Sequence, residues 1–186
     1  QDSYAAIVEL VKNAYDADSK SVEIHFKATE KPSENISGNL EKRIVITVRD
    51  YGHGMSKDTV INKWMVPSTP DKLERRKSPH GRIMQGRIGR YAASMLGSTL
   101  LLETVSEGAE KTTVLVDWRD FEKSEYLDDV EILVESHSTK ESHGTTLTIE
   151  GGQDYYKEWD KNQFIKLNFE LKKLISPVQN SIDKTA

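Results

Sequence analysis

Residues 9–17 have the sequence ELVKNAYDA and lie within Asp2–Ala17, a segment whose periodicity predicts a helix. The apolar residues of this helix would form one buried stripe: Ile7, Leu10, Val11 and Ala14. Glu9, Asn13 and Asp16 fall on a second face, roughly opposite, because they follow one another at about one helical turn. Such a polar face is typical of any amphipathic helix in contact with water. It also suits chemistry, since a carboxylate can deprotonate water and an amide oxygen can bind Mg²⁺.

A second candidate site ends the strand predicted over Arg43–Asp50, where the sequence continues as DYGHGM. Asp50 has the same parity as the apolar residues of the strand, so its carboxylate should point to the core side. A buried carboxylate needs a partner, and the exocyclic amine of a bound base would serve. Gly52 and Gly54 allow a sharp turn and a close ligand approach. An ordinary turn after a strand explains the same residues without a ligand.

The third candidate site contains two glycines at the start of a helix predicted over Ile88–Leu96. Gly86 and Gly89 would expose amide donors at the positive end of the helix dipole, and Arg87 or Arg90 could add charge for a triphosphate. A basic loop facing water is the plain alternative. The preceding segment, 66–86, is polar and rich in proline, which indicates a long irregular loop.

The fourth candidate site is Thr145, which opens the last predicted strand, Thr145–Ile149. Its hydroxyl should face the covered side of the sheet, where it needs a hydrogen-bond partner. Threonine is common in strands, so this residue has little meaning alone.

The remaining elements indicate one α+β domain. Ser56 is a plausible N-cap for a short helix that ends near Trp64, and Asp160–Ile175 reads as a closing helix. Residues 31–42 read as a loop. Further strands are expected at Ser21–Lys27, Thr99–Ser106, Thr112–Asp117 and Val130–Glu135. Because several strands follow one another directly, we expect a mixed, mostly antiparallel sheet with helices on one face.

Composition narrows the function classes. The 186 residues suit one domain, and the net charge of −4 gives no overall basic field for nucleic acid. Cysteine is absent, which excludes disulfides and cysteine metal ligands. The absence of cysteine also fits a reducing cytoplasm, where we expect the protein. No apolar run is long enough to cross a bilayer, so we expect no membrane contact. The sequence opens within a helix, and we therefore expect it to be part of a larger protein.

Taken together and in this order, the four motifs resemble the N, G1, G2 and G3 boxes of the GHKL ATPases (gyrase, heat-shock chaperone, histidine kinase and MutL). The resemblance covers about residues 2–150 and is nearest to the chaperone-like and MutL-like branch of bacterial proteins. It implies a Bergerat-type two-layer sandwich that binds ATP between helices and a lid. By this resemblance, 1–150 form the ATP-binding domain with a lid at about 66–90, and 151–186 form a helical extension or a linker.

The resemblance also implies roles for single residues. Glu9 would be the general base, and Asn13 would hold Mg²⁺ with the phosphates. Asp50 would bind the adenine amine. The other residues expected around the nucleotide are Asp16, Ala17, Gly52, Gly54, Met55 and Thr145, with Gly86, Gly89 and Arg90 in the lid.

The function implied is binding of ATP and ADP, with slow Mg²⁺-dependent hydrolysis used as a conformational switch. Relatives dimerise when ATP binds, so homodimerisation through further domains is expected, with a client protein or DNA that the sequence does not identify. Glu9 disfavours a histidine kinase, which usually has asparagine at that place. Three alternatives stay open: a nucleotide-binding module without hydrolysis, a phosphotransferase of the same superfamily, and a scaffold that binds no nucleotide.

Overall fold

The computed structural model describes residues 2–16, 19–65, 76–77, 83–84, 92–123 and 131–174. Its main sheet has six strands in the order β1-β2-β9-β5-β6-β8, and every neighbouring pair is antiparallel. These strands are β1 (Val22–Pro32), β2 (Leu40–Asp50), β5 (Thr99–Val105), β6 (Glu110–Asp117), β8 (Val134–Ser138) and β9 (Gly144–Gly151). A small second sheet joins β3 (Arg76–Lys77), β4 (Ile83–Met84) and β7 (Glu131–Ile132).

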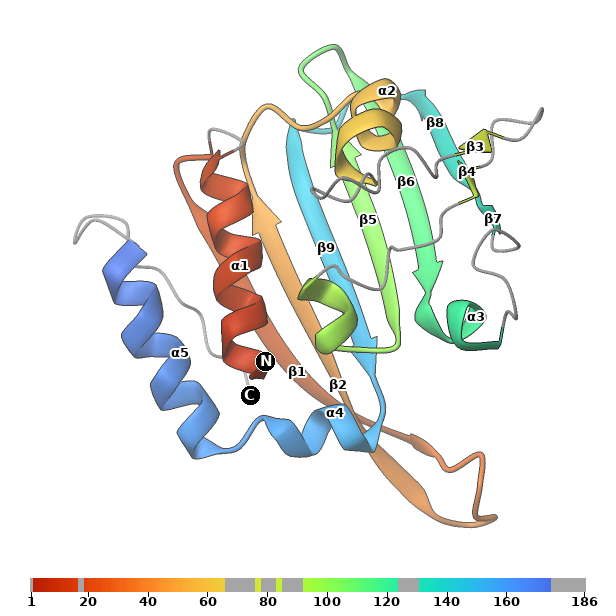
Figure 1. Ribbon diagram of the computed structural model, residues 1–186, viewed down its shortest axis with the longest axis vertical. Coiled ribbons are helices and arrows are strands. Elements are labelled where there is room, and N and C mark those ends of the chain that lie inside the picture. Colours follow the sequence, from red (N-terminus) through yellow and green to blue (C-terminus); the bar gives the residue numbers. More distant parts are fainter. Residues whose placement is uncertain are drawn as a thin grey trace.

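The helices lie over one face of the main sheet, which confirms the predicted α+β two-layer fold (Figure 1). Over that face lie α1 (Ser3–Asp16), α2 (Lys57–Thr59), the π-helix η1 (Val60–Trp64) and the 3₁₀ helix η4 (Ala92–Met95). Helix α5 (Lys161–Leu174) packs beside α1 after the short α4 (Gln153–Glu158), and α3 (Trp118–Lys123) follows β6.

The core lies between the covered face and these helices, as strand alternation requires. In β2 every second side chain is buried: Ile44, Ile46 and Val48. The largest fully buried side chains come from all parts of the described chain: Ile7, Ile46, Met65, Leu96, Leu100, Leu102, Ile149, Leu167 and Leu171. Phe26 of β1 meets Trp159 at a ring-centroid distance of 4.6 Å and Phe164 at 5.1 Å, so α4 and α5 are anchored to the sheet edge.

Several boundaries differ from those predicted. The loop predicted over 31–42 shortens to 33–39, because β1 and β2 continue into a long hairpin. The segment predicted as irregular over 66–86 contains β3 and β4. The helix predicted over 88–96 is a 3₁₀ helix at Ala92–Met95, and residues 88–91 lie outside the described residues. The strand predicted over 130–135 is interrupted at Leu133, and neither α3 nor α4 was predicted.

The prediction of a capped helix after the glycine turn is confirmed. The Ser56 side chain accepts the Thr59 amide, as an N-cap residue does. The helix ends at Trp64, but after Thr59 it has the wider π geometry. Such π turns are often found at functional sites.

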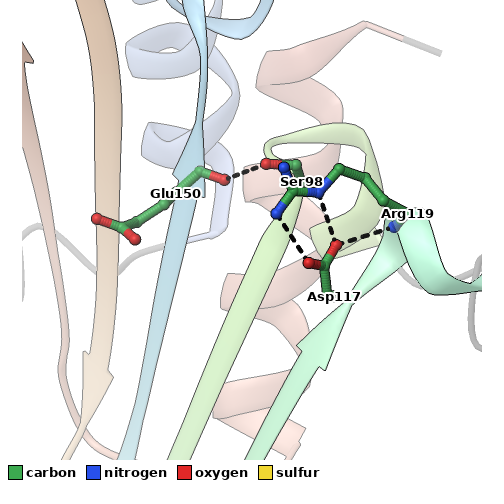
Figure 2. A network of polar contacts seen from close by, with 4 residues as sticks. All are labelled: Ser98, Asp117, Arg119 and Glu150. Atoms are coloured by element: carbon green, nitrogen blue, oxygen red, sulfur yellow. Dashed lines mark hydrogen bonds and ion pairs between the residues drawn. The ribbon is translucent and has the colours of Figure 1, made fainter. Parts of the chain in front are cut away.

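A network of polar contacts lies at the end of the main sheet that is farthest from Asp50 (Figure 2). The Ser98 amide donates to the Glu150 carbonyl oxygen at 2.8 Å, and the Trp118 amide donates to the Ser98 carbonyl oxygen at 2.9 Å. Beside these contacts, Arg119 and Asp117 form a bidentate ion pair. Nη2 of Arg119 is 2.8 Å from Oδ2 of Asp117, and Nε is 2.9 Å from Oδ1. This network joins β5, β6 and β9 at the end away from Asp50.

Among the described helices, none has the length and apolar character needed to cross a membrane.

Candidate functional site

Four elements converge at one end of the main sheet (Figure 1). The C-terminal end of α1, the end of β2, the start of β9 and the end of β5 all lie there. Ser19 ties the first two together, because its amide donates to Ala14 and its hydroxyl oxygen accepts the Tyr51 amide at 3.3 Å. The first and second predicted motifs therefore lie at the same end of the fold.

Asp50 is the last residue of β2 and lies partly buried on the helix-covered face. Burial raises the pKa of its carboxyl group, while hydrogen bonds from the backbone amides of Gly52 and Thr145 oppose that rise. The Gly52 amide is 3.0 Å from Oδ1, so the chain turns tightly around the carboxylate. The predicted orientation of Asp50 is confirmed.

A row of polar side chains crosses the covered face from Asp50. The strand register places Asp50 opposite Thr145, Thr145 opposite Thr104, Thr104 opposite Thr112, and Thr112 opposite Ser136. The Thr104 and Thr145 hydroxyl oxygens are 2.8 Å apart, and those of Thr112 and Ser136 are 3.3 Å apart. Both Thr104 and Thr112 are fully buried, so these contacts satisfy hydroxyls that water does not reach.

The glycine turn after Asp50 is held against the sheet by several hydrogen bonds. The Met55 amide donates to the Thr104 hydroxyl oxygen at 2.9 Å. The Glu107 amide donates to the His53 carbonyl oxygen, and Nδ1 of His143 donates to the Gly52 carbonyl oxygen at 2.5 Å. His53 also pairs with the Glu107 carboxylate, which lowers the pKa of Glu107. The backbone next to Asp50 is therefore positioned from β5 and from the loop before β9.

Two glycines at this end are required by packing. Gly54 has a φ of +67°, and a Cβ on it would lie 1.8 Å from the Val105 carbonyl oxygen. Gly144 has a φ of +141°, and its Cβ would lie 2.4 Å from the Asp50 carbonyl oxygen. The sequence predicted a close ligand approach at Gly54. In the structure the backbone at the end of β5 lies against Gly54, and contact of Gly54 with a nucleotide stays a prediction.

The polar face of α1 carries Glu9 and Asn13 as exposed side chains, one turn apart. Neither side chain is hydrogen-bonded to another described residue. The apolar stripe predicted for the opposite face is buried: Ile7, Leu10, Val11 and Ala14. Asp16 ends α1, but its side chain and the whole of Ala17 lie outside the described part of the chain.

The lid residues Gly86, Gly89 and Arg90, like most of the segment 66–90, also lie outside the described residues. Their predicted contact with phosphate therefore stays a prediction. Thr104 is a site residue that the sequence analysis missed. It has the same parity as Leu100 and Leu102, which are fully buried, so the argument applied to Thr145 would have found it.

The described residues contain no group of three histidine, aspartate or glutamate side chains arranged to hold a metal ion. A Mg²⁺ ion in proteins keeps several waters and is bound through one or two side chains together with substrate phosphates. The exposed amide oxygen of Asn13, a hard ligand beside Glu9, is compatible with that arrangement.

Comparison with known proteins identifies a family for this chain. Residues 2–145 match the family model described as histidine kinase-, DNA gyrase B-, and HSP90-like ATPase. A search of curated proteins found no matching relative. The family model spans well over half of the sequence, from the polar face of α1 to Thr145. The chain therefore belongs to the histidine kinase-, DNA gyrase B- and HSP90-like family of ATP-binding domains.

Proposed function

We propose that this domain binds ATP with Mg²⁺ and hydrolyses it slowly, as a conformational switch within a larger protein. The observation that carries the proposal is the partly buried carboxylate of Asp50 opposite Thr145, at the sheet end where α1 is tied to β2. The Gly52 and Thr145 amides satisfy part of this carboxylate, and a donor on a ligand would offset the remaining cost of burying its charge. An adenine amine would donate to Asp50 there.

Glu9 and Asn13 supply the reactive end in this proposal. Both are exposed on one face of α1, so a triphosphate and water can reach them. Asn13 would bind Mg²⁺ through its amide oxygen, and the ion would offset the charge of the phosphates. Glu9 would accept a proton from water as that water attacks the γ-phosphorus. The bond to the γ-phosphoryl group then breaks, and ADP leaves.

We expect slow turnover because the described residues that would face the γ-phosphate, Glu9 and Asn13, carry no positive charge. Phosphoryl transfer depends on cations that stabilise charge on the transferred group. The face of α1 that would meet the triphosphate carries the acid Glu9 and the amide Asn13. Lys12, which precedes Asn13 in the chain, is exposed. We propose that the cation comes from the lid or from another domain, and that homodimerisation accompanies ATP binding.

The test compares three versions of the 186-residue chain: the wild type, Glu9→Gln, and Asp154→Asn as a matched control. Asp154 is an exposed acid on α4, in the first turn of a helix away from the site. ATP binding is measured by thermal shift with Mg²⁺, and hydrolysis by release of inorganic phosphate. At ATP concentrations about 100-fold above Kd, the folded state should gain about 2.7 kcal/mol.

We expect Glu9→Gln to keep the thermal shift and to lose phosphate release by about 10²–10⁴-fold. Asp154→Asn should match the wild type in both. No thermal shift with ATP would refute nucleotide binding and favour a scaffold. A shift without phosphate release in the wild type would leave a binding module. Equal release by Glu9→Gln and the wild type would show that Glu9 is not the base.

A further inference from the structure

Thr104 connects the two parts of the adenine site proposed above. Its side chain is fully buried in β5, directly opposite Thr145 in the sheet register. Its hydroxyl oxygen accepts the Met55 amide at 2.9 Å and lies 2.8 Å from the Thr145 hydroxyl oxygen. One buried atom therefore contacts both the glycine turn that follows Asp50 and the side chain opposite Asp50.

Either threonine hydroxyl could donate to the other, and the distances around Thr104 favour one of the two directions. A threonine hydroxyl has one hydrogen and two lone pairs, and the Met55 amide occupies one lone pair of Thr104. The hydrogen of Thr104 has two acceptors within reach, Thr145 Oγ1 at 2.8 Å and the Gly144 carbonyl oxygen at 3.5 Å. The first distance is normal for an O–H···O bond and the second is too long for a strong one. The shorter distance favours Thr104 as the donor to Thr145, which would leave the hydrogen of Thr145 to donate elsewhere.

We propose that Thr104 is a positioning residue that makes the site selective for adenine over guanine. This inference rests on the proposed function. With Thr104 donating to it, Thr145 presents a donor beside the Asp50 carboxylate, which is an acceptor. Adenine has the complementary edge, with an amine donor at N6 and an acceptor at N1. Guanine has an acceptor at O6, which would face the Asp50 carboxylate, and a donor at N1, which would face the Thr145 hydroxyl hydrogen. Both contacts would be unfavourable.

The experiment measures the affinity of Mg²⁺-bound ATP, GTP and 1-deaza-ATP by calorimetry, the last lacking the N1 acceptor. The variants are Thr104→Val and Thr104→Ser, with Thr112→Val as the matched control. Thr112 is equally buried on the next strand and contacts Ser136. Both valine variants lose one buried hydroxyl, but only the first removes the contact with Thr145.

We expect Thr104→Val to lower the ratio of ATP to GTP affinity about tenfold, as loss of one oriented hydrogen bond does. Thr112→Val should lower the melting temperature and keep that ratio, and Thr104→Ser should retain it. In a Thr145→Val background, the Thr104 substitution should not change the ratio further, because Thr104 acts through Thr145.

The outcomes separate this inference from the proposed function. No ATP binding by the wild type would refute the function itself. ATP binding with an unchanged ATP to GTP ratio in Thr104→Val would overturn the role of Thr104 alone. If Thr104→Val does not fold, the wild type and Thr104→Ser still decide the matter. Both should bind ATP about tenfold more tightly than 1-deaza-ATP, and equal affinities would overturn the donor assignment.

Discussion

Gly54→Ala should destabilise the domain far more than alanine at another glycine of similar backbone conformation. Gly54 has a φ of +67°, and the added Cβ would lie 1.8 Å from the Val105 carbonyl oxygen, 2.5 Å from the Val105 carbonyl carbon and 3.0 Å from the Ser106 amide nitrogen. All three neighbours are backbone atoms of the β5 end, so no side chain can rotate away. The glycine turn must move by well over an ångström.

The magnitude has two parts. A non-glycine residue in the left-handed region costs about 1–2 kcal/mol. Overpacking that forces the backbone to shift costs about 1–3 kcal/mol more. We therefore expect Gly54→Ala to lower the free energy of unfolding by about 2–5 kcal/mol, which corresponds to a fall in Tm of roughly 4–20 °C for a domain of this size.

Gly38→Ala is the matched control. Gly38 has a φ of +85° in the β1–β2 hairpin, and no atom lies within 4 Å of its added Cβ. It should show the conformational cost of about 1–2 kcal/mol alone. Urea unfolding followed by circular dichroism measures both variants. Amide hydrogen exchange should also show faster exchange at Met55 in Gly54→Ala, since its bond to Thr104 lies in the displaced turn. Equal stabilities of the two variants would refute the packing argument.

Three further predictions follow from the site and from α5. Because burial raises the pKa of Asp50 above its ordinary value of 3.8, ATP affinity should fall on acidification at a higher pH than for an exposed aspartate. The ionised carboxylate of Asp50 accepts the adenine amine, so ATP binding releases a proton near that pKa. Calorimetry at several pH values should show this pH dependence in the wild type and not in Asp50→Asn. An affinity of the wild type that does not change with pH would contradict the role of Asp50. Ser19→Ala should lower the free energy of unfolding by about 1–3 kcal/mol and weaken ATP binding, because the Tyr51 amide loses the acceptor that connects α1 to β2. Urea unfolding measures the stability and calorimetry the affinity. An unchanged affinity for ATP would disprove the coupling between this contact and the site. Leu171→Ala should cost about 2–5 kcal/mol in urea unfolding because Leu171 is fully buried in α5, whereas the exposed Phe169→Ala should cost below about 0.5 kcal/mol. Equal costs would show that α5 is not part of the folded domain.

Strands and helices with strict periodicity could be predicted from the sequence. The apolar stripe of α1 and the alternation in β2 define one buried face each, and the structure buries those faces. The orientation of Asp50 followed from the same alternation. Boundaries were harder to predict, because the β1–β2 hairpin extends through polar residues whose backbone pairing needs no apolar face.

Contacts between distant segments could not be predicted. Thr104 lies 41 residues before Thr145 and 49 after Met55, and only the strand order brings the three together. The glycines of the second motif were read as flexibility for a ligand, whereas Gly54 is confined by β5. Alternation gives the face of each side chain, but not the strand that pairs beside it.

The most direct measurement is a crystal structure of this chain with Mg²⁺ and a non-hydrolysable ATP analogue. We expect the adenine amine within hydrogen-bond distance of the Asp50 carboxylate, beside Thr145, and Mg²⁺ bound to Asn13 with the γ-phosphate facing Glu9. A nucleotide bound away from Asp50, or a triphosphate that does not reach the Glu9–Asn13 face of α1, would contradict it.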